Sequence, residues 1–188
     1  MFIQTQSTPN PDTLKFLPGQ DVSPAGNHEF QSLDAAAISP LARAIFQLNG
    51  VTGVFLGEDF VSVSKSANAD WAILKPQVLA AVMDHYMSGL PVVEGGSGPA
   101  PDETVYEGET AEIVAEIREL IATRVRPAVA QDGGDIEFHH FDAKSGVVSL
   151  VMRGACSGCP SSSQTLKQGV ENLLRHYVPE VTAVEAVA

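Results

Sequence analysis

The sequence is poor in cysteine, in basic residues and in long apolar runs. Its 188 residues include two cysteines, and 11 Lys and Arg stand against 23 Asp and Glu, giving a net charge of −12. Two cysteines are too few for a disulfide framework in a chain of this length. The acidic surplus would repel phosphate backbones, so we expect no nucleic-acid partner. No apolar run approaches the roughly 20 residues that span a bilayer, so we expect no membrane segment.

The amino terminus also lacks the usual targeting signals. The stretch MFIQTQSTPNPDTLKF has neither the basic start nor the long apolar run of a secretory signal, and it is not an Arg-rich, acid-poor leader. Hydrophobic residues make up 44% of the sequence and charged residues 18%, which is ordinary globular usage. We therefore expect a soluble, folded protein in a reducing compartment.

Residues 89–109 divide the chain into two segments. This stretch, GLPVVEGGSGPAPDETVYEGE, is rich in Gly and Pro and carries five acidic residues but no Lys or Arg. Such a composition predicts a flexible, extended linker that is kept open by its own charge. We expect two small α+β domains, residues 1–88 and residues 110–188, on either side of it.

The first segment shows alternating signals for strands and helices. Two extended runs flank a proline-rich turn at residues 9–12, and a second hairpin is predicted around residues 57–59. Ser39 precedes a proline and a helical apolar pattern, so it is expected to cap a helix. Residues 70–88 predict a longer helix that packs on the sheet. We see no charged constellation or glycine loop here that indicates chemistry.

The second segment predicts an α-β-β-α-β order. A helical apolar stripe follows Thr110, which we expect to be its N-cap, and Pro127 lies within or near the end of that helix. IEFHHF and VVSLVM predict two strands, and an amphipathic helix follows the cysteines before a last strand, VTAVEAV.

Both cysteines lie in the stretch Arg153-Gly-Ala-Cys-Ser-Gly-Cys-Pro160, between a predicted strand and a predicted helix. Pro160 suits the first position of that helix. The free N–H groups of a helix start favour negative charge, so we expect both sulfurs, Cys156 and Cys159, to ionise more easily than an isolated thiol. Arg153 is the nearest basic side chain in the sequence and could assist.

The spacing of the two cysteines is compatible with three uses. A thiol-disulfide enzyme needs two cysteines alone, whereas a zinc site or an iron-sulfur cluster usually takes four ligands. His139 and His140 are neighbours in a predicted strand and should face opposite ways, and His176 lies far along the following helix. If the site is a four-thiolate cluster, a second copy of the chain related by a two-fold axis would supply the missing pair.

The motifs resemble a known family. RPAVAQDGGDIEF and VVSLVMRGACSGCPSSSQTLKQGVENLL resemble the NifU-like domain of the Nfu family of iron-sulfur cluster carriers, and TPNPDTLKF, FVSVSK and DWAILKP resemble its companion domain. The resemblance implies that Cys156 and Cys159 ligate a [4Fe-4S] cluster bridging a homodimer. It further implies a non-catalytic carrier that is served by upstream cluster-assembly proteins and delivers to apo clients such as lipoyl synthase or aconitase-type enzymes. It also implies a cytoplasmic, bacterial-type protein.

The cysteine pair has alternative uses, and two other parts of the chain have expected roles. The same cysteine pair could serve a thiol-disulfide oxidoreductase, or it could bind zinc in a structural dimer. We expect residues 1–88 to recognise clients rather than bind a cluster, because they contain no cysteine. We expect the Asp132-Gly-Gly-Asp135 motif to be a turn that sets a helix against the sheet, because carboxylates prefer harder metals than a sulfur site suits.

Overall fold

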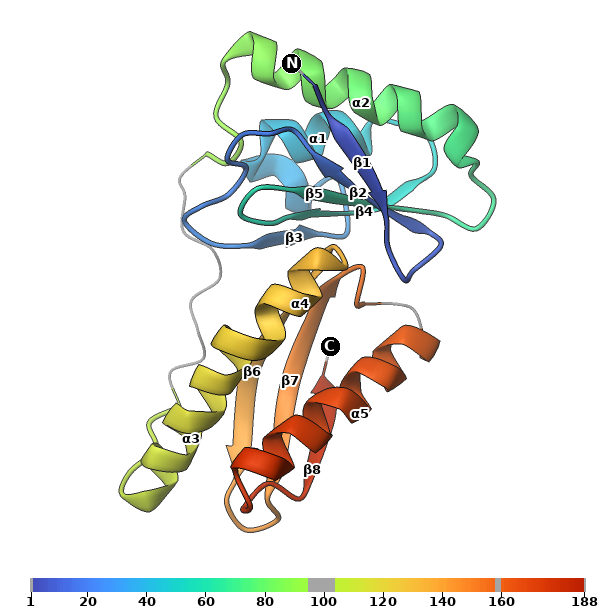
Figure 1. Ribbon diagram of the computed structural model, residues 1–188. Helices are drawn as coiled ribbons and strands as arrows, with labels where there is room; N and C mark the ends of the chain where they lie inside the picture. The colour runs from blue at the N-terminus through green and yellow to red at the C-terminus, as the bar shows by residue number, and fades with distance from the viewer. Residues whose placement is uncertain (1, 95–103, 158–159, 188) are drawn as a thin grey trace. The chain divides into compact units, whose positions relative to one another are not determined.

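The computed structural model describes residues 2–94, 104–157 and 160–187 and divides the chain into two compact units. The first unit comprises residues 1–99 and the second comprises residues 100–188 (Figure 1). Both units combine helices with a β-sheet, which confirms the predicted α+β class with two small domains. Among the described residues, no helix has the length and apolar character needed to cross a membrane.

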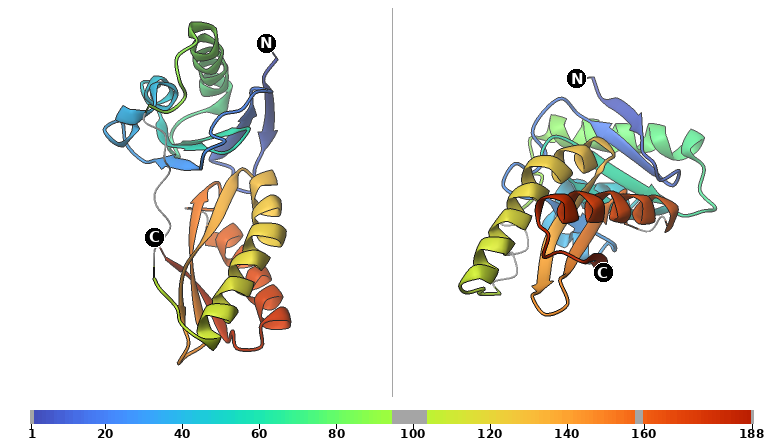
Figure 2. Two further views of the ribbon diagram at one scale, coloured as in Figure 1. Left: turned by 90° about the vertical axis from the view of Figure 1, so that its left-hand side faces the viewer. Right: turned by 60° about the horizontal axis from the view of Figure 1, so that its bottom comes forward.

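The first unit is built on an antiparallel sheet with strand order β1-β2-β5-β4-β3. Helices α1 and α2 lie on the same face of this sheet, and buried side chains between the two layers form the core (Figures 1 and 2). The elements in chain order are β1 (Gln4–Ser7), β2 (Thr13–Leu17), β3 (His28–Phe30), the 3₁₀ helix η1 (Ala35–Ile38), α1 (Pro40–Phe46), β4 (Val51–Leu56), β5 (Val61–Lys65) and α2 (Trp71–Ser88).

Local signals in the sequence place most of these elements. Ser39 caps α1 as predicted, because its hydroxyl accepts a hydrogen bond of 3.0 Å from the amide of Ala42. Asp70 caps α2 by accepting a bond of 2.9 Å from the amide of Ala72. The hairpin predicted around residues 57–59 joins β4 to β5. β3 and η1 were not predicted, because these short elements depend on neighbours distant in sequence rather than on a pattern of their own.

The second unit contains a three-stranded sheet, in the order β6-β7-β8, with its helices on one face (Figure 2). β6 and β7 are antiparallel, whereas β8 joins β7 in the parallel direction by way of α5. This order confirms the predicted α-β-β-α-β arrangement. The elements are α3 (Glu109–Leu120), the π-helical segment η2 (Ile121–Val125), α4 (Arg126–Gln131), β6 (Gly134–Asp142), β7 (Val147–Gly154), α5 (Pro160–Tyr177) and β8 (Ala183–Val187).

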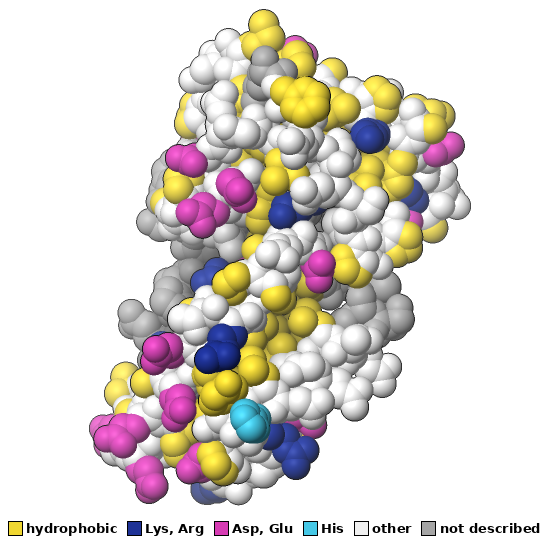
Figure 3. Space-filling model, in the orientation of Figure 1, with side chains coloured by type: hydrophobic (Ala, Val, Ile, Leu, Met, Phe, Trp, Pro, Cys, Tyr) yellow, Lys and Arg dark blue, Asp and Glu magenta, His cyan; other side chains and the backbone are white. Residues whose placement is uncertain are grey.

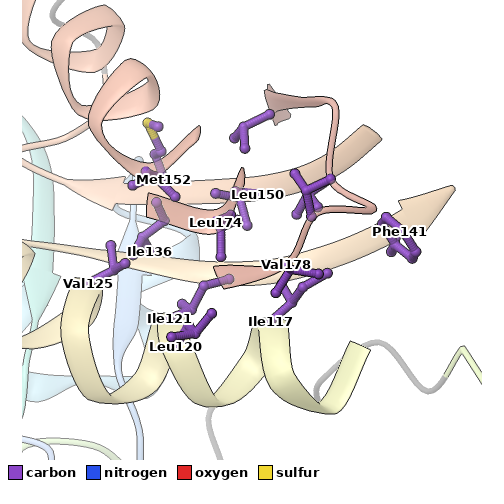
Figure 4. Close-up of a cluster of buried hydrophobic side chains, with 14 of the residues drawn as sticks. Ile117, Leu120, Ile121, Val125, Ile136, Phe141, Leu150, Met152, Leu174 and Val178 are labelled. Atoms are coloured by element: carbon purple, nitrogen blue, oxygen red, sulfur yellow. The ribbon is translucent and has the colours of Figure 1, made fainter. Parts of the chain in front are cut away.

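α3, η2 and α4 follow one another without a break. Pro127 lies at the start of α4, where it cannot donate a backbone hydrogen bond, and the wider π-helical turn directly precedes it. Ile121 and Val125 of this turn remain buried in the core (Figure 4). The predicted N-cap, Thr110, is wrong: α3 is capped by Gly108, whose φ of +60° suits a glycine.

The described ends of the predicted linker, residues 89–109, pack against the unit next to them. The carbonyl of Val92 accepts a hydrogen bond of 2.6 Å from the Ser39 hydroxyl, and the amide of Glu94 donates one of 2.7 Å to the carbonyl of Ile38, the last residue of η1. At the other end, the ring of Tyr106 packs against the core of the second unit. These described ends of the predicted linker are therefore packed, and residues 95–103 lie outside the described residues.

Acidic side chains gather along α3 on the face of the second unit shown in Figure 3. The exposed carboxylates of this helix belong to Glu109, Glu112, Glu116 and Glu119. Part of the negative surplus of the sequence therefore lies along one helix, where it repels polyanions.

Candidate metal site at the cysteine loop

Cys156 lies at the exit of β7, in a tight turn that leads toward α5. Gly154 ends β7 with a φ of +64°, in the left-handed region that favours glycine. Its carbonyl accepts hydrogen bonds from the amide of Ser157 at 3.1 Å and from the Ser157 hydroxyl at 2.8 Å. α5 begins at Pro160, as predicted. The second cysteine, Cys159, lies outside the described residues.

The side chain of Cys156 is buried. It is 7% exposed and belongs to the core of the second unit. Its sulfur lies beside Gly134, the first residue of β6. A Cβ atom on Gly134 would lie 2.5 Å from this Sγ, 2.7 Å from the carbonyl oxygen of Arg153 and 3.1 Å from the amide nitrogen of Cys156. The first two separations are shorter than Cβ atoms in proteins adopt, so the sulfur occupies space that any larger residue would need.

Two contacts hold the start of β6 beside the cysteine loop. Asp135 is 3% exposed and accepts hydrogen bonds from Nε and Nη2 of Arg126, each 2.8 Å long. The amide of Ala155 donates to the carbonyl of Gly133 at 3.2 Å, which joins the turn before β6 to the loop after β7. Gly133 itself has a φ of +80°, so this turn favours glycine on conformational grounds. The Asp132-Gly-Gly-Asp135 motif thus contacts both α4 and the cysteine loop at the start of β6.

The predicted ease of ionisation is wrong for Cys156. Burial, together with the nearby negative charges of Asp132 and Asp135, raises the pKa of Cys156 to about 12. The prediction considered the helix start but not the enclosure of the thiol in the core. Arg153 forms an ion pair with Glu137 at 3.2 Å, so its charge is already partly offset. At neutral pH the free thiol is protonated, and a metal must displace that proton in order to bind.

Histidines do not complete a metal site in the described parts of the chain. No group of three His, Cys, Asp or Glu side chains is placed there to hold an ion. His139 and His140 are both exposed on β6, where the pairing with β7 is irregular, so the predicted simple alternation does not apply. Nδ1 of His140 lies 2.9 Å from the hydroxyl of Tyr106. His176 lies on the last turn of α5.

The donor set suits a soft metal. Two thiols per chain fit iron-sulfur chemistry or zinc, yet either site commonly needs four ligands. The sequence identified both cysteines and the glycine turn. It did not place Gly134 against Cys156 or pair Arg126 with Asp135. The sequence shows a glycine pair flanked by acidic residues, but this pattern does not indicate which other residues it contacts in the folded chain.

Family models match both units of the chain. Residues 3–89 match the model described as the N-terminal domain of scaffold protein Nfu/NifU, and residues 117–185 match the NifU-like domain. The mitochondrial NifU-like proteins 4 and 5 of Arabidopsis thaliana are each 54% identical to the chain over 185 residues, which is 98% of its length. The chain belongs to the Nfu/NifU family.

Further relatives carry related names. The protein named NFU1 iron-sulfur cluster scaffold homolog, mitochondrial, of Drosophila erecta is 52% identical over all 188 residues. This Nfu/NifU chain spans 65% to 67% of the length of these three relatives. The solution structure of a NifU-like protein from Saccharomyces cerevisiae is 25% identical, and the match covers 50% of this chain and 86% of that one with a TM-score of 0.46.

The expectation of a cytoplasmic, bacterial-type protein is contradicted by these relatives. All three are named as mitochondrial proteins. The family includes mitochondrial proteins, so a resemblance to it does not indicate a bacterial, cytoplasmic protein. The Drosophila erecta protein is named as an iron-sulfur cluster scaffold homolog.

Proposed function

We propose that this Nfu/NifU chain carries a [4Fe-4S] cluster between two copies of itself, through Cys156 and Cys159 of each copy. The observation that carries the proposal is the donor set: the sequence has two cysteines, three positions apart, and both come after the last residue of β7 and before the first residue of α5. A four-iron cluster typically takes four thiolates. A two-fold axis through the cluster would supply the second pair by symmetry.

The cluster is cargo in this proposal. Each chain contributes two of the four ligands, so separation of the two copies releases half of the ligand set at once. The protein therefore acts as a non-catalytic carrier, loaded by upstream cluster-assembly proteins. It delivers to apo iron-sulfur proteins, with lipoyl synthase and aconitase-type enzymes as the client class.

The surroundings of Cys156 favour a carrier over a thiol-disulfide oxidoreductase. An attacking cysteine needs an accessible sulfur with substantial thiolate at neutral pH. Cys156 is buried instead, and burial raises its pKa to about 12. A bound metal removes this difficulty, because coordination replaces the proton.

Anaerobic reconstitution with iron and sulfide tests the proposal. We expect a brown dimer with about four irons and four sulfides per pair of chains, measured by metal analysis and native mass spectrometry. Cys156→Ser and Cys159→Ser should each prevent stable cluster binding. Ser157→Ala is the matched control, because it changes the same loop and keeps both thiols.

Other outcomes of this experiment are informative. A colourless monomer, or a single chain that holds a complete cluster, would contradict the proposal. Zinc in protein purified without oxygen, with no uptake of iron, would favour a structural zinc dimer. Sustained reduction of insulin disulfides by the metal-free protein would favour the oxidoreductase.

The first unit is assigned to client recognition. It contains no cysteine, and its family model is separate from that of the cluster-binding unit. Tethering a recognition unit to a carrier raises the effective concentration of carrier near the client. Deletion of residues 1–94 should leave cluster binding intact and slow transfer to at least one client. Unchanged transfer to every client tested would remove this assignment.

A further inference from the structure

We propose that Gly134 is a positioning residue for the Cys156 sulfur: its missing side chain leaves the space in which the sulfur is held before a cluster binds. The inference rests on the proposed function for its biological meaning, but the contact itself belongs to the metal-free chain. Gly134 does not touch a cluster in this proposal and acts through Cys156.

The need for glycine at position 134 comes from space rather than from backbone conformation. Gly133 and Gly154 both have positive φ, whereas Gly134 is not among the residues with positive φ. Its backbone is therefore open to any L-residue. The obstacles are the Cys156 Sγ, 2.5 Å from where a Cβ would lie, and the backbone oxygen of Arg153, at 2.7 Å.

The backbone around Gly134 has little freedom to move away from the sulfur. Gly134 pairs with Gly154 at the end of the β6–β7 ladder. On its other side, Asp135 is buried and held by two hydrogen bonds from Arg126. The carbonyl oxygen of Arg153, 2.7 Å from where the Cβ would lie, belongs to the same ladder.

The cysteine side chain is the least constrained of the groups that a Cβ would meet. A methyl group at position 134 should therefore push the sulfur out of its enclosure, with some strain remaining in the ladder. The Cys156 thiol would become more accessible and would be displaced from the position that this loop gives it. Glycine at position 134 thus shelters the thiol and sets where it lies.

The test compares Gly134→Ala with Gly169→Ala in the full chain. Gly169 lies on α5 of the same unit, and an added Cβ there would meet nothing within 4 Å, so it is a matched control. In a Cys159→Ser background, Cys156 is the one thiol left. We expect iodoacetamide to label it roughly tenfold faster in Gly134→Ala than in Gly169→Ala, because the sulfur is no longer enclosed.

A double-mutant cycle separates the sulfur contact from general strain in the strand. Gly134→Ala should lower the urea midpoint for unfolding of the second unit. Hydrogen exchange of peptides from β6 and β7 monitors this unfolding. In a Cys156→Ala background the sulfur is absent, so the same substitution should cost clearly less. If Gly134→Ala alone fails to fold, recovery of folding in the Cys156→Ala background supports the same conclusion.

Three results would overturn the inference: equal labelling of the two alanine variants, an equal cost of Gly134→Ala in both backgrounds, or a misfolded variant that Cys156→Ala does not recover. These readouts use metal-free protein. They therefore test the role of Gly134 even if the wild-type chain proves unable to bind a cluster. That result would contradict the proposed function but not the role of Gly134. With both thiols present, Gly134→Ala should also bind severalfold less iron per chain than Gly169→Ala on reconstitution.

Discussion

Arg126 holds the carboxylate of Asp135 with two hydrogen bonds of 2.8 Å, and this pair joins α4 to β6 immediately beside the cysteine loop. The Asp135 side chain is 4% exposed, whereas that of Arg126 is 41% exposed. Removing the arginine would take two charge-assisted hydrogen bonds from a buried carboxylate, which costs more than losing a surface ion pair.

Arg126→Leu should therefore destabilise the second unit by about 2 kcal/mol. Arg175→Leu is the control, because Arg175 is 56% exposed and lies 3.8 Å from Glu171, and it should cost at most about 0.5 kcal/mol. Hydrogen exchange of β6 and β7 peptides is the suitable measurement, since the single tryptophan, Trp71, reports on the first unit. Equal effects of the two substitutions would show that the pair contributes no more than a surface contact.

Tyr106 anchors the segment that leads into the second unit. Its hydroxyl accepts a hydrogen bond of 3.0 Å from the amide of Phe141 and lies 2.9 Å from Nδ1 of His140. Tyr106→Phe should destabilise this unit by about 1 kcal/mol and speed exchange of the Phe141 amide. Tyr177→Phe, at an exposed tyrosine on α5, should change neither quantity. Unaltered exchange at Phe141 in Tyr106→Phe would show that the hydrogen bond does not protect β6.

Ser39 has two hydrogen bonds in the first unit. It accepts from the amide of Ala42 as the cap of α1, and it donates to the carbonyl of Val92 at 2.6 Å, although it is fully buried. Ser39→Ala removes both contacts and should lower the free energy of unfolding by about 2 kcal/mol. Trp71 fluorescence in urea measures this change. The exposed Ser32 serves as control, because its hydroxyl accepts a hydrogen bond of 3.2 Å from the amide of Ala35. Ser32→Ala should lower the free energy of unfolding by only a few tenths of the loss expected for Ser39→Ala. Similar losses for both serines would argue against the cap and the second contact.

His85 makes the first unit sensitive to acid. Burial lowers the pKa of His85 below its usual 6.5, and its Nε2 atom has no hydrogen-bond partner among the described residues. The unfolded chain therefore takes up the proton first as the pH falls. The stability that depends on neutral His85 is complete above pH 6.5 and is lost as the pH falls through the lower, folded-state pKa.

The matching experiment follows Trp71 fluorescence in urea between pH 7 and pH 5. The unfolding midpoint of the wild-type chain should fall over this interval, and His85→Leu should show a smaller fall because the titrating group is absent. His176→Leu, in the second unit, should retain the wild-type dependence. The same slope in the wild type and in His85→Leu would contradict the role of this histidine.

Patterns that act over a few residues predicted most of the fold. The cap at Ser39 and the stripe of α3 could be recognised because helix starts and amphipathic faces are local properties. The π-helical turn before Pro127 was missed, since a proline within an apolar stripe does not say whether the helix ends or widens. β3 was missed because a strand of three residues is too short to show an alternating pattern of apolar and polar side chains.

The candidate site divides in the same way. The place of Cys156 after a strand, and the helix start at Pro160, could be inferred from the sequence alone. The burial of Cys156 could not, because it depends on Gly134 and on the core of a sheet whose strands meet only in the folded chain. The raised pKa of this thiol follows from that burial, so the expectation of an easily ionised sulfur was wrong for a tertiary reason.

The parallel pairing of β8 with β7 has a consequence for biosynthesis. The cysteine loop leaves the ribosome before α5 and β8, so a nascent chain exposes it while one side of β7 still lacks a neighbour. An unpaired strand edge invites association with other chains. Truncations that remove Ala183–Val187 should therefore leave this edge of β7 exposed and should aggregate.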